Sequence, residues 1–408
     1  MIVVVDGLRA AALGAYGNTI YPTPALDRFA AESVVFDACF APAADLAAVY
    51  RAMWQSRHPL RASADDDATP SFAQMAATFG YATTLLSDDE SVLALPGAAS
   101  FAQHVSAVSA SDEATLMSAP ALYHTFGTAC EALAAPTSNE PKLIWLHTQG
   151  LYGPWQAPLE SQMSLLDEGD PPPVEESRPP DIVLPNGDNS ETAFRYACAY
   201  AAQVMLLDDC WNGLMEAMQA ADGEQDWLVM LLGARGFPLG EHDRIGGVDQ
   251  RLHVEQLHVP WLLRFPDGRG RLSRRSQLVS HFDLTPTLTE FWAEIETKSS
   301  STDSVSSMSS DGRSLGPLFI KANAPWRESL LSTSGNCRSL RTTGWTLGEE
   351  FAAKNPSGGA IRQTLYVRPD DRWEANDVAV RCPEVVAELA QIAEDTAVRI
   401  RTGATACE

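Results

Sequence analysis

Long apolar runs and paired cysteine motifs are missing from this sequence. No segment reaches the roughly 18 consecutive apolar residues that a membrane-spanning helix needs, so we expect no membrane span. The seven cysteines are odd in number and none forms a Cys-x-x-Cys motif, which argues against a zinc site and a closed disulfide framework. Cys39, Cys198 and Cys210 lie in apolar stretches and are predicted to be small core residues.

Positive charge is also scarce. The chain has 29 Lys and Arg residues against 53 Asp and Glu residues, which gives a formal net charge of -24. A nucleic-acid partner would require a basic face to meet its phosphates, so we expect none. An anionic substrate would need a local cation to overcome this field, and solubility is the favoured explanation of the acidity.

The amino terminus lacks the marks of an export signal. Met1 to Asp6 contains neither a positively charged leader nor a cleavage site. As printed, the protein is expected to be cytoplasmic. A misplaced start or a trimmed leader would instead make it an exported protein.

Apolar strands and amphipathic helices alternate along the first 297 residues. Strands are predicted at 2–5, 34–40, 82–86, 143–147, 227–232 and 259–265, and those at 2–5 and 143–147 are expected to be buried. Helices are predicted at 24–32, 45–55, 71–79, 191–218 and 283–293. This alternation indicates an α/β fold, with a doubly wound, mostly parallel sheet flanked by helices.

Composition changes suggest where the chain divides. Residues 168–190 are acidic and rich in proline, which predicts a long surface loop. Residues 298–311 are rich in serine and are interpreted as a linker. We therefore expect an α/β domain over 1–297 and a smaller C-terminal α+β subdomain over 312–408, ending in a helix at 383–400.

Seven short segments carry a family resemblance through their fixed order. They are Ile2 to Gly17, Tyr21 to Ala31, Arg57 to Pro59, Leu239 to His242, Leu257 to Arg264, Val279 to Leu288, and Asp311 to Leu315. Each is weak alone, but the ordered set resembles the sulfatase family of the alkaline phosphatase superfamily over roughly residues 1–380. The resemblance implies an alkaline phosphatase-like fold.

The resemblance also implies a hydrolytic mechanism with three components. A Cys converted to formylglycine supplies the nucleophile at the start of a helix. A calcium ion held by clustered carboxylates and an amide binds the sulfate oxygens. Lys and His side chains stabilise the charge that develops on the leaving oxygen.

The nucleophile position is not filled by a suitable residue. The family pattern of Cys or Ser, any residue, Pro, any residue, Arg falls between Ala43 and Arg51, where this sequence has no Cys, Ser or Thr. Asp45 is the best-placed polar candidate for catalysis there, but the role favoured for it is that of a helix N-cap. Arg51 is either a shifted relic of the motif Arg or a surface residue.

The metal position has changed as well. The resemblance places ligands at Asp6 and Gly7, where the family has two aspartates, and at Ala234 and Arg235, where it has Asp followed by His or Asn. Calcium needs six to eight oxygen ligands, which Asp6 alone cannot supply, so we expect no bound calcium. We predict instead that Arg235 pairs with Asp6 in the vacated metal position, the alternative being that Arg235 points to solvent.

The positions on the leaving-group side are also altered. Tyr152 replaces the family's second His, and Asp249 falls where the family has a Lys. His147 survives, either as a catalytic residue or as a packed structural histidine. His242 closes the Leu-Gly-Glu-His turn and is a further catalytic candidate.

Three hypotheses follow. The leading one is a catalytically degenerate sulfatase-like protein that retains binding of a sulfated or other anionic small molecule or glycan. The second is an active, divergent sulfuric ester or phosphoester hydrolase that uses Asp45, His147, His242 or Asp283 in a new arrangement. The third is a scaffold for protein interactions, in which the 168–190 loop and the Ser-rich linker make the contacts.

Overall fold

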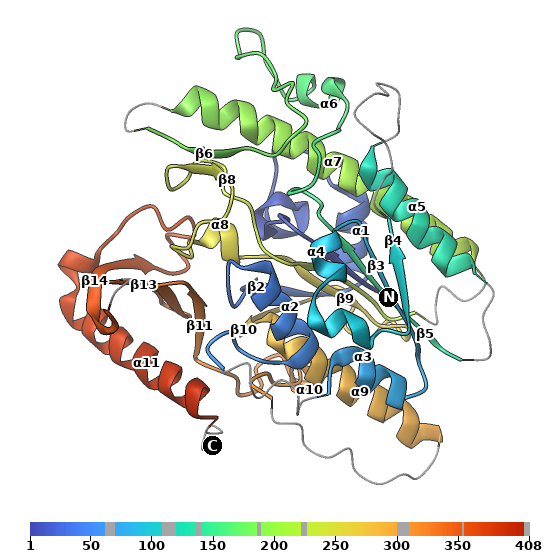
Figure 1. The fold of residues 1–408 in the computed structure, drawn as a ribbon. Helices are drawn as coiled ribbons and strands as arrows, with labels where there is room; N and C mark the ends of the chain where they lie inside the picture. Colours follow the sequence, from blue (N-terminus) through green and yellow to red (C-terminus); the bar gives the residue numbers. More distant parts are fainter. Residues whose placement is uncertain are drawn as a thin grey trace. The chain divides into compact units, whose positions relative to one another are not determined.

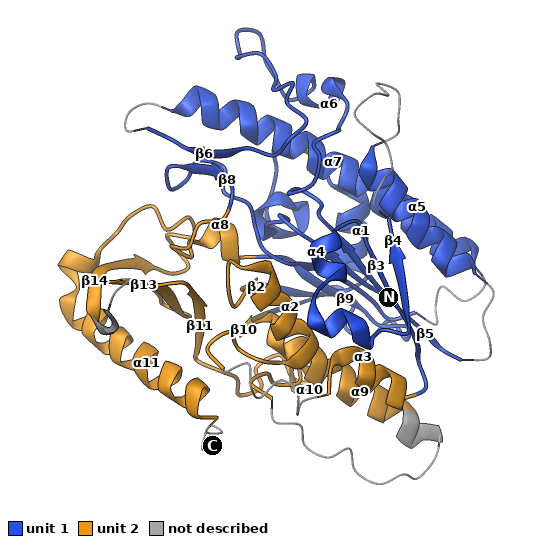
Figure 2. Ribbon diagram, in the orientation of Figure 1, with its two compact units in different colours: residues 1–37, 80–247, 259–275 blue, residues 38–79, 248–258, 276–408 orange. Residues whose placement is uncertain are grey.

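The computed structural model describes residues 1–61, 70–107, 120–135, 140–185, 189–221, 227–299, 310–352 and 355–403. They form two compact units (Figure 2). Unit 1 comprises residues 1–37, 80–247 and 259–275, and unit 2 comprises residues 38–79, 248–258 and 276–408. The predicted Ser-rich linker at 298–311 lies almost entirely outside the described residues.

An eight-stranded sheet forms the centre of the α/β fold, as predicted. Its strands, in spatial order, are β10 (Ser273–Val279), β2 (Val34–Cys39), β9 (Trp261–Arg264), β7 (Val229–Gly233), β1 (Ile2–Val5), β5 (Lys142–Thr148), β3 (Ala82–Ser87) and β4 (Gln103–Ser106). The strands from β7 to β4 run parallel, whereas β9 is antiparallel to both β7 and β2. Every residue of β1 is buried, as expected for a parallel strand covered on both faces.

Three helices of unit 1 pack together beside the sheet (Figure 1). They are α1 (Pro24–Ala31), α5 (Ala121–Ala134) and α7 (Ser190–Ala220). Asp208 of α7 accepts hydrogen bonds from the backbone N–H groups of Ala25 and Leu26, at 3.0 and 2.8 Å. This side chain therefore satisfies the first donors of α1, whose own N-cap makes no side-chain hydrogen bond.

Shorter elements complete unit 1. They are α4 (Glu90–Leu93), α6 (Leu159–Met163), β6 (Asp181–Val183) and β8 (Arg244–Gly246). The predicted 168–190 loop is irregular over most of its described length, but it contains β6, which pairs antiparallel with β8. Within the described residues no helix is both long and apolar enough to cross a membrane.

Unit 2 contains a small antiparallel sheet and several helices, which confirms the α+β prediction for the C-terminal part. The sheet is a meander of β11 (Ser329–Ser334), β12 (Cys337–Thr342), β13 (Trp345–Ala352) and β14 (Asn355–Val367). The helices are α2 (Leu46–Gln55), α3 (Phe72–Thr78), α8 (Val254–Leu257), α9 (Leu284–Ser299), α10 (Gly316–Ile320) and α11 (Pro383–Thr402).

The helix α11 covers one face of this small sheet. Leu340, Leu347 and Leu365 form a buried cluster with Leu389 and Ala393 of the helix. The strand β11 is also bonded to the segment that follows β2. The backbone N–H of Thr333 donates to the carbonyl of Pro42 at 2.9 Å. Unit 2 thus differs from the sequential division at residues 297–312, because segments far apart in the chain contribute to it.

The carboxylate of Glu374 gives unit 2 a specific sensitivity to acid. Glu374 is 3% exposed and pairs with the fully buried Arg341 at 3.2 Å. Burial opposes ionisation of Glu374, but Arg341 and His253 outweigh it and lower its pKa from 4.5 to about 2. The folded state therefore binds fewer protons than the unfolded state between these values, so this contribution is complete above pH 4.5 and is lost as the pH falls towards 2.

We expect Glu374→Gln to remove this sensitivity. The difference between 4.5 and about 2 corresponds to roughly 3 kcal/mol of stability near neutrality. Urea unfolding at pH 7, 4.5 and 3 should show the free energies of unfolding of wild type and variant converging as the pH falls. A gap between the two proteins that stays constant across this range would contradict the assignment.

Candidate functional site

The candidate site begins where β1 and β7 end side by side. Asp6 directly follows β1, and its backbone N–H donates to the carbonyl of Thr148 at 3.0 Å. Ala234 directly follows β7, and its backbone N–H donates to the carbonyl of Val5 at 2.9 Å. These positions lie at the carboxyl edge of the parallel strands, where open α/β sheets bind their ligands.

Arg235 is bound to Asp6 by a two-pronged ion pair. Its Nε lies 2.9 Å from Asp6 Oδ1, and its Nη2 lies 2.9 Å from Asp6 Oδ2. The side chains are 12% and 3% exposed, so the pair is largely shielded from water. The predicted pairing is confirmed, and the alternative in which Arg235 points to solvent is wrong. Such bidentate pairs are among the stronger polar contacts in proteins.

Tyr152 supports this ion pair from one side. The Arg235 guanidinium carbon lies 4.5 Å from the centre of the Tyr152 ring, a cation–π geometry. The Tyr152 hydroxyl donates towards two carbonyl oxygens, that of Gly247 at 2.8 Å and that of Gly236 at 3.2 Å. Burial raises the pKa of Tyr152 well above its usual range, so its hydroxyl stays neutral and acts as a hydrogen-bond donor.

The backbone around Gly7 leaves no room for a second carboxylate. Gly7 has φ +77°, a conformation that side chains rarely adopt. A Cβ atom there would lie 2.8 Å from Cβ of Leu151 and 3.1 Å from the Tyr152 ring. Leu151 is in turn held in place by its backbone N–H, which donates to the carbonyl of Asp6 at 2.9 Å.

The groups around Asp6 do not fit a calcium ion. Both oxygens of Asp6 are bound to a guanidinium, Ala234 offers no side-chain oxygen, and Gly7 cannot be extended into one. In the described part of the chain, no group of three or more His, Cys, Asp or Glu side chains is arranged to hold a metal ion. Calcium requires six to eight oxygen ligands, far more than this arrangement offers.

A second ion pair joins the segment Ile2 to Gly17 to the segment Leu239 to His242. Arg9 Nη1 lies 2.5 Å from Glu241 Oε1, while the backbone N–H of Leu239 donates to Glu241 Oε2 at 2.8 Å. Burial opposes ionisation of Glu241, but Arg9 outweighs it and lowers its pKa. His242 follows in the same turn and is half-buried. Sequence reasoning missed this pair, although both segments had been matched to the family.

His147 lies on β5 and is completely buried. Its Nε2 is 3.8 Å from Asp89 Oδ2. Burial acts against the charge of Asp89, but the nearby His147 imidazole and hydrogen bonding with Ser91, whose backbone N–H donates to Asp89 Oδ1 at 2.8 Å, lower its pKa to about 2. The neighbouring Asp88 accepts hydrogen bonds from the Thr148 hydroxyl and a backbone N–H, although burial still raises its pKa. These surroundings favour a packed structural histidine.

The remaining candidates belong to unit 2, where each has a structural partner. Asp45 is exposed and is the N-cap of α2, accepting from the backbone N–H of Ala48 at 2.9 Å. The predicted capping role is therefore confirmed. Arg51 donates from Nη1 to the carbonyl of Arg61 at 2.9 Å, so this guanidinium supports the chain that follows α2.

Asp249 and Asp283 are each neutralised by an arginine. Asp249 Oδ2 lies 2.8 Å from Arg251 Nη2, and although burial opposes its charge, the hydrogen bonds from Arg251 lower its pKa. Asp283 is completely buried and binds Arg327 through two contacts of 2.6 and 2.5 Å. Its carboxylate also accepts from the backbone N–H of Arg313.

Comparison with known proteins identifies the family. The family model named Sulfatase matches residues 1–292. A protein solved in complex with its substrate D-glucosamine-2-N,6-O-disulfate has a TM-score of 0.75 and 15% identity, covering 98% of this chain and 97% of that one. The phosphonate monoester hydrolase of Agrobacterium radiobacter has a TM-score of 0.73 and 15% identity, with coverages of 98% and 95%.

A 2-O GAG sulfatase has a TM-score of 0.72 and 17% identity, covering 98% of this chain and 91% of that one. A search of curated proteins finds no match. At these identities the solved structures show a shared fold only. The family match covers well over half of the chain and agrees with the α/β sheet described above. This protein therefore belongs to the sulfatase family.

Proposed function

We propose that this protein keeps the sulfatase fold without the family's calcium-dependent hydrolysis of sulfate esters, and that it acts by binding an anionic ligand. The Arg235–Asp6 ion pair is the observation that carries the proposal. A guanidinium that engages both oxygens of Asp6 supplies the positive charge next to β1, where the family mechanism requires a metal ion. A Lewis acid that polarises a sulfate oxygen is not replaced by a charge-neutral ion pair.

Two further losses support the same proposal. The segment from Ala43 to Arg51 offers no Cys, Ser or Thr, and its one polar candidate, Asp45, is engaged as a helix cap. Tyr152 has a hydroxyl that stays neutral, so it cannot shuttle a proton as a histidine would. Nucleophile, metal and acid each contribute several kcal/mol to one transition state, so retaining a single component would restore little rate.

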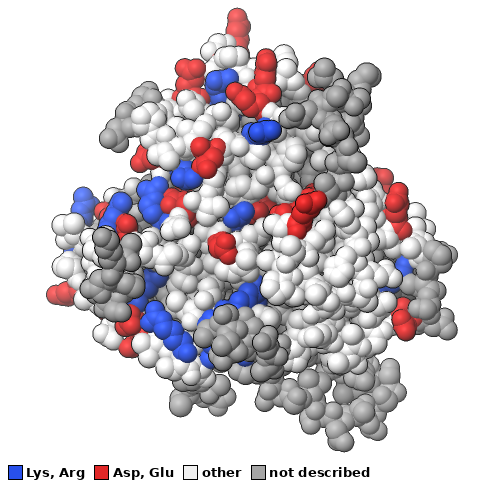
Figure 3. Space-filling model, in the orientation of Figure 1, with Lys and Arg blue, Asp and Glu red and all other residues white. Residues whose placement is uncertain are grey.

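A sulfated sugar or a related anionic small molecule is the proposed ligand class. One structurally similar protein was solved with a disulfated glucosamine, and another is described as a GAG sulfatase. The overall charge of -24 would repel such ligands unless cations gather locally. Figure 3 shows Lys and Arg side chains interspersed with acidic groups on this face of the molecule.

The proposal is tested by measuring calcium and turnover on the purified full chain. We expect no saturable calcium binding by isothermal titration calorimetry and no change in melting temperature between excess calcium and a chelator. We also expect no turnover of an aryl sulfate or aryl phosphate above the uncatalysed rate. Stoichiometric calcium binding that disappears in Asp6→Asn would overturn the proposal.

The divergent hydrolase remains the other outcome of this experiment. Turnover of either aryl ester that is lost in Asp45→Ala would support it, because Asp45 would then be more than a helix cap. The matched control is Ser71→Ala, which also removes a helix N-cap of unit 2, at α3. Equal loss of turnover in both variants would point to a folding defect, so circular dichroism spectra of both variants are part of the test.

A further inference from the structure

The small sheet of unit 2 has a polar face opposite the one that α11 covers. Cys337, Glu350 and Arg362 are cross-strand partners on β12, β13 and β14, and they form one row across this face. Gly348 and Thr364 form the next pair along β13 and β14. Side chains alternate between the two faces of a strand, so these five residues point away from the apolar cluster under α11.

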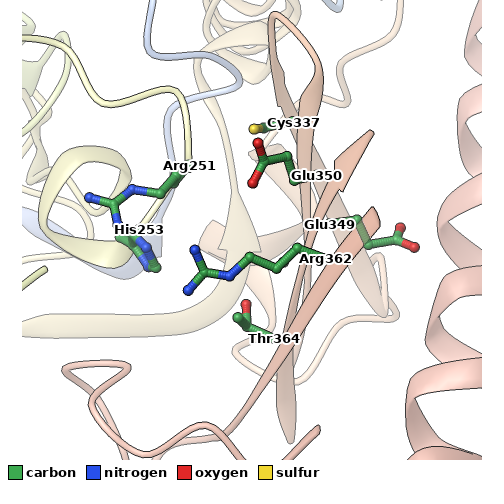
Figure 4. Close-up of a pocket in the computed structure, with 8 residues that line it drawn as sticks. Arg251, His253, Cys337, Glu349, Glu350, Arg362 and Thr364 are labelled. Atoms are coloured by element: carbon green, nitrogen blue, oxygen red, sulfur yellow. The ribbon is translucent and has the colours of Figure 1, made fainter. Parts of the chain in front are cut away.

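A recess of about 30 Å³ opens on this polar face (Figure 4). It is lined by Arg251, His253, Cys337, Gly348, Glu349, Glu350, Arg362 and Thr364. A single water requires about 10–15 Å³, so the recess can take a group larger than one water. Gly348 keeps it open, because a Cβ there would lie 2.6 Å from the Thr364 hydroxyl oxygen.

Basic groups from separate segments meet at this recess. Arg362 extends from β14 towards His253, with Arg251 beside it (Figure 4). Arg362 forms no ion pair within the described part of the chain, not even with Glu350, its direct partner on β13. Glu349 points away (Figure 4) and is neutralised by Arg338 at 2.5 Å. The recess therefore presents the guanidinium of Arg362, unpaired among the described residues, beside the His253 imidazole. Arg251, which is paired with Asp249, and the carboxylate of Glu350 also line it.

The loop that carries Arg251 and His253 is held in a strained conformation. Leu252, between them, has φ 63°, and its carbonyl accepts from Arg341 Nη2 at 2.9 Å. Glu374, which supports this loop, has φ 56°, and its carboxylate accepts a hydrogen bond from the backbone N–H of Val254 at 2.9 Å. Such positive φ values cost about 1–3 kcal/mol each and persist only where the surroundings enforce them, which they do mainly at functional sites.

We infer that this recess is a binding site for a small oxyanion, such as a sulfate, phosphate or carboxylate group. Arg362 supplies the free charge, Arg251 and His253 line the opposite wall, and the Thr364 hydroxyl offers a further donor. Guanidinium groups bind planar and tetrahedral oxyanions through charge-assisted hydrogen bonds. The inference extends the proposed function by naming a locus for its anionic ligand.

The test is isothermal titration calorimetry of the full chain with sodium sulfate, sodium phosphate and sodium acetate at constant ionic strength. We expect saturable one-to-one binding of at least one of the three, and the comparison shows which oxyanion the site prefers. Losing a charge-assisted hydrogen bond should weaken binding at least about tenfold in Arg362→Gln. Arg381→Gln, which removes an exposed charge of unit 2 outside the recess, should bind like wild type.

A second variant distinguishes binding inside the recess from nonspecific attraction of anions to the positive side chains. Gly348→Val should fill the recess and abolish binding while every charged residue is retained. Absence of saturable binding for all three anions, or equal weakening in Arg362→Gln and Arg381→Gln, would overturn the inference. Either failure would leave the calcium and turnover results intact, because those report on Asp6 and Arg235.

Discussion

Replacing Arg235 with methionine should lower the free energy of unfolding by about 3–5 kcal/mol, the range found when one partner of a buried ion pair is removed. The reason is the carboxylate of Asp6, which is 3% exposed and would lose both of its guanidinium contacts. Methionine preserves most of the aliphatic length and can still pack on the Tyr152 ring. Urea unfolding followed by circular dichroism measures the effect.

The double variant Asp6→Asn with Arg235→Met is the essential control. It removes the charge together with its partner, so it should be more stable than Arg235→Met alone, and the cycle should give a coupling of about 1–3 kcal/mol. A coupling near zero would mean that the contact between Asp6 and Arg235 adds nothing to the free energy of unfolding. In that case Arg235 could not be said to take over the electrostatic role of a cation beside β1.

Replacing Asp283 with asparagine should destabilise unit 2 by a comparable amount, about 3–5 kcal/mol. Asp283 is fully buried and caps its own short 3-10 helix by accepting from the backbone N–H of Ser280 at 2.9 Å. Its two contacts with Arg327 would become weaker neutral ones in the variant, leaving a guanidinium that is only 10% exposed without a counter-charge. Thermal and urea unfolding both report the loss.

A matched ion pair on the surface shows what burial adds. Arg274 and Asp37 of unit 1 also meet at 2.5 Å, but their side chains are 48% and 33% exposed. Arg274→Met should therefore cost at most about 1 kcal/mol. If Arg274→Met and Asp283→Asn lower the free energy of unfolding equally, the separation of the charged atoms, and not burial, would determine the strength of these pairs.

Measuring turnover of an aryl ester in Asp283→Asn tests a different point. A large loss of turnover with little loss of stability would make Asp283 a candidate catalytic residue again.

The Asp6–Arg235 pair could be predicted because the family resemblance places both residues at the metal position, and because Asp6 directly follows β1 while Arg235 is the second residue after β7. Adjacent parallel strands bring their carboxyl ends together, so two opposite charges at those ends have few other partners. The Asp45 cap was predictable for a local reason, since its partner is only three residues away. In both cases the position of the residue relative to a strand end or a helix start is enough to identify its partner.

Other contacts had no such local signal. Asp208 caps α1 from a position about 180 residues later, and nothing in its helical surroundings indicates that partner. The Arg341–Glu374 pair and the strained Leu252 depend on how a loop meets the polar face of the small sheet. Register and loop packing determine these contacts, and a single sequence shows neither.

The close packing of Leu151 and Tyr152 over Gly7 opposes any single substitution that would build a metal site around Asp6. An aspartate placed at position 7 would collide with that loop, and an asparagine at position 235 would leave Asp6 buried without its guanidinium partner. Each such step passes through a less stable protein that still lacks the other ligands. In evolutionary terms the packing is an epistatic barrier between this arrangement and a metal-binding one.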